Sequence, residues 1–158
     1  MLWRGPLATP DSLHRMVRLS PGWLVAFCAA VLAVAVWLPW LTTRAAGGGR
    51  ANAVGGVQGN LTLPPHFSAG QMIALLASTL LVAGAMAARG LSARAASSAA
   101  LGISVLIAVL TLWYYRLYVR GPVAAGYGLY IAAAVTVLAI VVSVWAMVAA
   151  WAAAGRRP

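Results

Sequence analysis

Four long apolar runs, none with a charge in its interior, constrain the fold of this chain most. They cover residues 22–41, 70–88, 98–118 and 127–151. Each is close to the roughly 20 residues that an α-helix needs to cross the hydrocarbon core of a bilayer. Charged residues make up only 8% of the 158 residues, against roughly 25% in soluble domains. The pattern predicts an all-α membrane protein, an antiparallel bundle of four transmembrane helices.

The segments between these runs are short, apart from one. Residues 42–69 hold six glycines and two prolines, so they predict a loop rather than a helix. Within it, short strands are expected around a glycine turn, and they would involve Val54, Val57, Leu61 and Leu63. The leader 1–21 is expected to hold a short interfacial helix that starts at Asp11. The remaining connections are 89–97 and 119–126, and the tail is 152–158.

The arginines indicate an orientation. If both termini are cytoplasmic, seven arginines lie inside and four lie outside, which the positive-inside rule favours. The outer four are Arg44, Arg50, Arg116 and Arg120. The prediction is therefore a multi-pass protein of the plasma (inner) membrane, with the 42–69 loop extracytoplasmic. Trp and Tyr prefer the headgroup region, and we expect an outer belt that includes Trp37, Trp40, Trp113, Tyr114, Tyr115, Tyr118, Tyr127 and Tyr130.

A single acidic residue, Asp11, limits the chemistry that this chain can perform. Carboxylates are the usual general acids, general bases and hard-metal ligands. His14 and His66 would lie on opposite sides of the membrane, and Cys28 has no second cysteine to pair with. The sequence therefore predicts no enzyme activity, no cofactor and no metal site. The net charge of +10 is carried at segment ends rather than on one face, so no nucleic-acid partner is expected.

Small residues recur at helical spacing in three of the runs. The pairs are Gly22 and Ala26, Gly70 and Ala74, and Gly128 and Ala132. Such spacing lets helix backbones approach closely in a membrane. Because alanine is abundant in this chain, chance produces some of these pairs, and packing within the bundle and docking of a partner helix both remain open.

Arg116 and Arg120 form the most distinctive cluster. They lie one helical turn apart at the end of the third run, among aromatic residues that include Trp113 and Tyr115. Three interpretations compete: contact with lipid phosphates, ion pairing with a partner protein, or binding of an anionic substrate such as a fatty acid. Arg44 and Arg50 in the loop are weaker candidates for the same roles.

The Trp-Leu-Pro-Trp end of the first run, residues 37–40, is followed by a glycine-rich loop. This combination resembles small four-span membrane proteins of high-GC bacteria. The general plan is similar to claudins and other tetraspan proteins, although the loop has no cysteines. We expect a non-catalytic accessory subunit of a larger bacterial membrane complex, such as an Mce-type lipid-transport machine in the cell envelope. Its expected partners are membrane lipids and membrane subunits with acidic residues. The alternatives are a stand-alone lipid or small-anion binding or transport protein, and a membrane enzyme.

Overall fold

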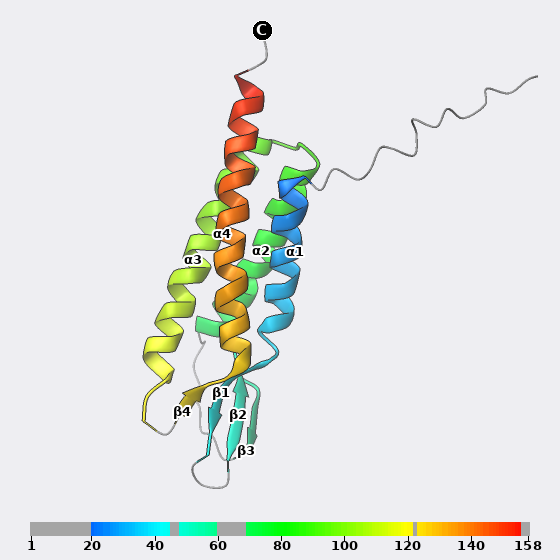
Figure 1. Ribbon diagram of the computed structural model, residues 1–158. Helices are drawn as coiled ribbons and strands as arrows, with labels where there is room; N and C mark the ends of the chain where they lie inside the picture. The colour runs from blue at the N-terminus through cyan, green and yellow to red at the C-terminus, as the bar shows by residue number, and fades with distance from the viewer. Residues whose placement is uncertain (1–19, 45–47, 60–68, 122, 156–158) are drawn as a thin grey trace, which may run out of the picture.

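Four helices lie side by side, and a small antiparallel β-sheet extends from one end of them (Figure 1). The computed structural model describes residues 20–44, 48–59, 69–121 and 123–155. The helices are α1 Pro21–Ala35, α2 Ala69–Ala88, α3 Ala93–Tyr118 and α4 Tyr127–Ala154. The strands are β1 Pro39–Thr43, β2 Gly49–Asn52, β3 Val57–Gly59 and β4 Val123–Ala125. We call the end of the bundle that carries the strands the sheet end.

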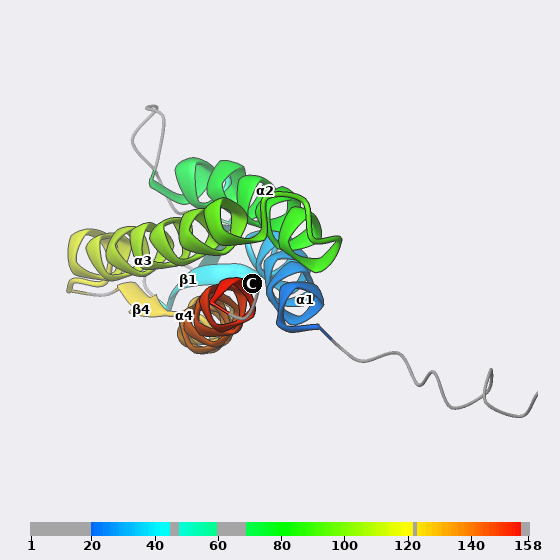
Figure 2. The ribbon, with the colours of Figure 1, turned by 90° about the horizontal axis from the view of Figure 1, so that it is seen from above.

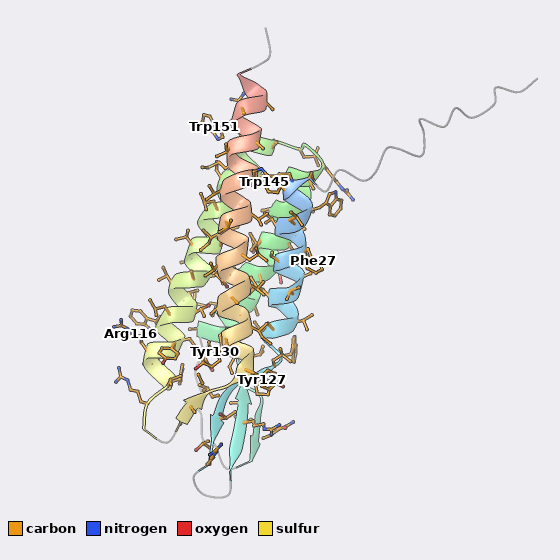
Figure 3. All side chains as sticks on the ribbon, viewed as in Figure 1. Phe27, Arg116, Tyr127, Tyr130, Trp145 and Trp151 are labelled. Atoms are coloured by element: carbon orange, nitrogen blue, oxygen red, sulfur yellow. The ribbon has the colours of Figure 1, made fainter. Side chains whose placement is uncertain are left out.

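The helices α2, α3 and α4 are long and apolar enough to cross a membrane. This confirms the helices predicted at 70–88, 98–118 and 127–151, although α3 begins earlier, at Ala93, and α4 ends later, at Ala154. Their outward faces carry exposed large apolar side chains, which Figure 3 shows for Tyr130 and Trp145. The chain is therefore a multi-pass membrane protein with three candidate spans and one shorter apolar helix.

The first apolar run differs from its prediction. Helix α1 has 15 residues and ends at Ala35, well before Leu41. Pro39 explains the early end, because proline lacks an N–H donor and disfavours helical geometry in the residue before it. The last residues of the run form β1 instead, where the aromatic ring of Trp40 and the β-branched Thr42 and Thr43 suit a strand.

The sheet corrects the all-α class. Its order is β3-β2-β1-β4, so three strands come from the α1–α2 connection and one from the α3–α4 connection. Thr42 lies opposite Arg50 on β2 and opposite Ala124 on β4. Val57 is in β3, as expected, whereas Val54 lies in the turn before it. Leu61 and Leu63 are outside the described residues, and so is the interfacial helix expected from Asp11.

The four helices form a ring in which each contacts its neighbours, as Figure 2 shows from above. Helices α1 and α2 approach each other closely at two glycines. A Cβ atom on Gly84 would lie 2.7 Å from the backbone nitrogen of Ala26, and one on Gly22 would overlap the backbone of Ala88. Glycine therefore allows the two backbones to touch, which is the usual way in which membrane helices gain packing contacts.

Candidate functional site at the sheet end

The sheet is fastened to the bundle by backbone hydrogen bonds. The N–H of Ala53 donates to the carbonyl of Val36 over 3.1 Å, and the N–H of Gly126 donates to the carbonyl of Trp40 over 2.7 Å. The side-chain amide of Gln71 at the start of α2 donates to the carbonyl of Val54 over 3.1 Å. These bonds connect the strands to the ends of α1, α2 and α4, so the sheet has a defined position relative to the helices.

Trp40 forms the core of this junction. It occupies a β-bulge opposite β2, and its side chain is completely buried. Its indole N–H donates to the carbonyl of Ala35 over 2.8 Å, and its ring meets that of Tyr114 edge to face at 5.1 Å. Tyr114 in turn packs on Tyr118 at 4.6 Å. Trp40 and Tyr114 therefore do not belong to the predicted outer belt, because both are core residues.

One face of the sheet carries a shallow groove of about 210 Å³. We call it the sheet groove, and its main lining residues are Trp37, Pro39, Arg50, Asn52, Val57 and Gln58. Trp37 has 68% of its surface exposed, and Arg50 and Val57 are also exposed. Asn52 is fixed within the groove because its side-chain oxygen accepts a hydrogen bond from the N–H of Gly56. The groove thus combines an aromatic ring, a cation and amide groups.

Sequence reasoning identified Arg50 but missed the groove around it. Trp37 was expected to lie in a lipid belt, and Asn52 and Gln58 were not singled out. A signal was available, because Pro39 predicts that the helix ends early, which moves Trp37 beside the following strands.

The second cluster of charge lies on α3. Arg116 points away from the bundle near the sheet end (Figure 3), and it lines an outward groove of about 480 Å³. We call this the α3 groove, and it is lined by Val109, Leu112, Trp113, Arg116, Leu117 and Arg120. The Nε–H of Arg120 donates to the carbonyl of Arg116 over 3.0 Å, so its side chain folds back toward the last helical turn. The structure therefore brings Trp113, Arg116 and Arg120 together.

Tyr115 faces a different groove, between α3 and α4. This α3–α4 groove has a volume of about 220 Å³, and its lining includes Thr111, Leu112, Tyr115, Tyr130, Thr136 and Val137. The hydroxyls of Thr111 and Thr136 donate to carbonyls of their own helices, over 2.8 Å and 2.6 Å. Because these donors are already used, the floor of the groove is apolar in character. Leu112 lines both this groove and the α3 groove.

The small residues predicted for helix packing have different neighbours. Gly22 and Ala26 are buried at the α1–α2 contact. Gly70 packs against the backbone of Ala53, and Gly128 packs against Leu38 and Pro39, so both of these glycines contact the connection that carries the sheet. Ala74 is half-buried on α2, and Ala132 is fully buried on α4.

The arginines differ in their surroundings. Arg94, at the opposite end of the bundle, lies over the ring of Trp151 at 5.8 Å, a cation–π contact. Arg44 follows β1 and is exposed, and it lies apart from Arg116 and Arg120. Since Asp11 is the chain's one acidic residue and lies outside the described residues, no side-chain carboxylate in the described part can pair with any arginine.

Within the residues that the structure describes, no three His, Cys, Asp or Glu side chains gather as metal ligands would. At the sheet end, the Arg side chains can bind anions and the Trp side chains can bind apolar groups. No family model, no curated protein and no solved structure matches this chain.

Proposed function

We propose that this protein is a non-catalytic accessory subunit of a larger membrane complex, which it joins through the sheet groove. The observation that carries the proposal is that the exposed Trp37, in the turn before β1, and the exposed Arg50 of β2 line the same groove. Tryptophan and arginine are enriched among the residues that dominate binding energy in protein interfaces. Arg50 also has no carboxylate within the described chain to pair with, so an acidic residue of the partner would form its ion pair.

The groove defines the chemistry of the partner. A planar guanidinium favours a carboxylate held by two parallel hydrogen bonds, so the partner segment would place an Asp or Glu against Arg50. An apolar side chain of the same segment would lie against Trp37 and Val57. Arg44, at the end of β1, would add attraction for an acidic surface.

The placement of the sheet relative to the membrane supports a partner in water rather than lipid. At about 1.5 Å per residue, Arg94 and Arg116 lie about 33 Å apart along α3, close to the ~30 Å of the hydrocarbon core. The sheet lies beyond the Arg116 end of the helices (Figure 3). With cytoplasmic termini, the sheet groove would face the extracytoplasmic side.

In this arrangement α1 is the fourth crossing. It packs along the length of α2. At one end Gly22 lies against Ala88. At the other end the carbonyl of Val36 accepts the N–H of Ala53, and Ala53 lies against Gly70. A turn follows Ala35, in which the N–H groups of Trp37 and Leu38 donate to the carbonyls of Val34 and Ala35. At about 2 Å per residue, this tight turn adds to the length of the short helix before β1 begins.

Charge reversal in the groove tests the proposal. The tagged protein would be purified in mild detergent from its own host after photo-cross-linking from a benzophenone amino acid at Gln58. We expect a discrete cross-linked partner that carries an acidic segment, and we expect Arg50→Glu to reduce the cross-linked yield at least tenfold. Arg89→Glu, in the connection at the opposite end of the bundle, is the matched control and should leave the yield unchanged.

Recovery of the chain alone and monodisperse, with no cross-link at Gln58, would overturn the proposal. Equal yields from Arg50→Glu and Arg89→Glu would do the same. A charge swap would establish the contact. Arg50→Glu should reduce the cross-linked yield, and changing the partner's acidic residue to arginine should restore it in the Arg50→Glu variant.

A further inference from the structure

We infer that α3 carries a binding site for one anionic diacyl phospholipid. The phosphate would lie at Arg116 and Arg120, and the two acyl chains would occupy the two grooves that meet at Leu112. This inference does not depend on the proposed function, because the site lies on the outward face of α3 and shares no residue with the sheet groove.

The headgroup part of the site rests on two arginines that line the same groove. The hydrogen bond from Arg120 to the carbonyl of Arg116 brings the second cation back toward the first. Arg116 lies about 33 Å from Arg94 along the same helix, which places it near the boundary of the ~30 Å hydrocarbon core. Phosphate oxygens are available at this depth, and guanidinium binds them with paired hydrogen bonds.

The chain part of the site rests on the two grooves. Both extend from the arginine level toward the middle of the bundle, and Val109 lies about 10 Å from Arg116 along the helix. Leu112 forms the ridge between them. The α3–α4 groove, at about 220 Å³, is smaller than the ~300–1,000 Å³ of typical ligand pockets. Its size and its satisfied threonine hydroxyls suit a single hydrocarbon chain better than a polar ligand.

The shape of the α3 surface favours lipid over a partner helix. Helix interfaces in membranes are enriched in small residues that let backbones approach. The outward face of α3 instead carries large exposed side chains: Val105, Leu106, Val109, Leu112, Trp113 and Leu117. Flexible acyl chains can fill the spaces between such side chains, whereas a rigid helix would contact only their tips.

Native mass spectrometry tests the site. The protein would be released from nanodiscs that contain equal amounts of phosphatidylglycerol, which is anionic, and phosphatidylcholine, which has no net charge. We expect one phosphatidylglycerol to be retained per protein. The double variant Arg116→Gln and Arg120→Gln should reduce this retention at least tenfold, whereas Arg50→Gln in the sheet groove should leave it unchanged.

A second pair of variants tests the acyl chains without touching the arginines. Ala133 lines the α3–α4 groove, so Ala133→Leu should fill it and reduce retention several-fold. Ala134, exposed on the same helix outside the groove, gives the matched control Ala134→Leu. Lysophosphatidylglycerol, with one chain, should be retained more weakly than the two-chain lipid, and soluble glycerol phosphate should not displace the bound lipid.

Three results would overturn the inference. The first is equal retention of the two lipids by the unmodified protein. The second is equal retention by Ala133→Leu and Ala134→Leu, which would restrict binding to the headgroup. The third is displacement by glycerol phosphate, which would show that the arginines bind a free phosphate. Circular dichroism of each variant confirms that it is folded, and the Ala133 pair still decides the question if the arginine pair is unstable.

Discussion

At the scale of single residues, Trp40 contributes more to the fold than its position at the end of an apolar run suggests. Its ring is fully buried at the junction of α1, β1 and α3, and its indole N–H bonds to the carbonyl of Ala35. That carbonyl lies at the end of α1, and it also accepts the backbone N–H of Leu38 over 3.1 Å. The side chain thus caps α1 and packs against Tyr114 at the same time.

Replacement of Trp40 should therefore destabilise the protein. Trp40→Phe keeps most of the ring but removes the donor, and we expect a loss of about 1–2 kcal/mol in the free energy of unfolding. Trp40→Ala should cost about 3–5 kcal/mol. Unfolding in detergent micelles, followed by circular dichroism, measures both. Trp37→Phe is the control, because Trp37 is exposed, and a loss there as large as that of Trp40→Phe would contradict the assignment.

Arg116 and Arg120 have a structural role in addition to the proposed lipid contact. Arg116 lies in the last turn of α3 and Arg120 just beyond it. Cations at a helix C-terminus interact favourably with the helix dipole, typically by about 0.3–1 kcal/mol. This is why the lipid experiment needs the Ala133 variants, which change the groove and keep both charges.

At the scale of elements, the contact between α1 and α2 depends on glycine. Gly84→Ala should destabilise the protein by several kcal/mol, because its Cβ would meet the backbone of Ala26 at 2.7 Å and the helices would have to separate. Gly102→Ala is the matched control, since nothing lies within 4 Å of the added Cβ. That change should be neutral or should stabilise α3 by up to about 1 kcal/mol. Unfolding in micelles distinguishes the two, and similar losses for both would refute this account.

Polar residues follow the seam between α3 and α4. Ser104 and Ser143 are both fully buried, with their hydroxyl oxygens 3.5 Å apart. Ser104 also donates to the carbonyl of Ala100 over 2.8 Å. Interhelical hydrogen bonds in membranes contribute about 0.6 kcal/mol on average. We therefore expect Ser143→Ala to cost less than about 1 kcal/mol in an unfolding measurement, and a loss of several kcal/mol would mean that the two hydroxyls do more than pack the seam.

The sequence predicted the long helices well and the sheet poorly, and the reason is physical. Runs of apolar residues without charge have one stable form in lipid, because every backbone donor must be bonded within the segment. The strands are three to five residues long. Strand β4 contains only Val123, Ala124 and Ala125, and its pairing with β1 depends on a partner far away in the chain. No local pattern contains that information.

The candidate site was predictable in part for the same reason. Arg116, Arg120 and Trp113 are close in sequence and share one helical face, so their meeting follows from helix periodicity. The sheet groove is lined by Trp37, in the turn before β1, and by residues of the three strands β1, β2 and β3. Because its geometry depends on the register between β2 and β3, sequence reasoning found Arg50 but not its neighbours.

At the scale of the whole molecule, the charges and the sheet predict an orientation. In a variant with Cys28 changed to Ser, a single cysteine at Gln58 should react with a membrane-impermeant maleimide added to intact cells or spheroplasts. A single cysteine at Arg89 should react only after the membrane is permeabilised. Both sites are exposed, so access and not burial decides the outcome. Labelling of Arg89→Cys from outside would reverse the proposed topology and move the sheet groove to the cytoplasmic side.

The pairing of β1 with β4 also has a consequence for how the protein is made. Thr42 and Ala124, which share one ladder, are 82 residues apart. Ribosomes add roughly 5–20 residues per second, so β1 waits at least several seconds for β4 to be synthesised. During that interval the edge of β1 that later pairs with β4 has unpaired backbone groups, which can form hydrogen bonds with another extended segment. Nascent chains stalled before residue 123 should therefore be the species most readily bound by chaperones or trapped as swapped dimers.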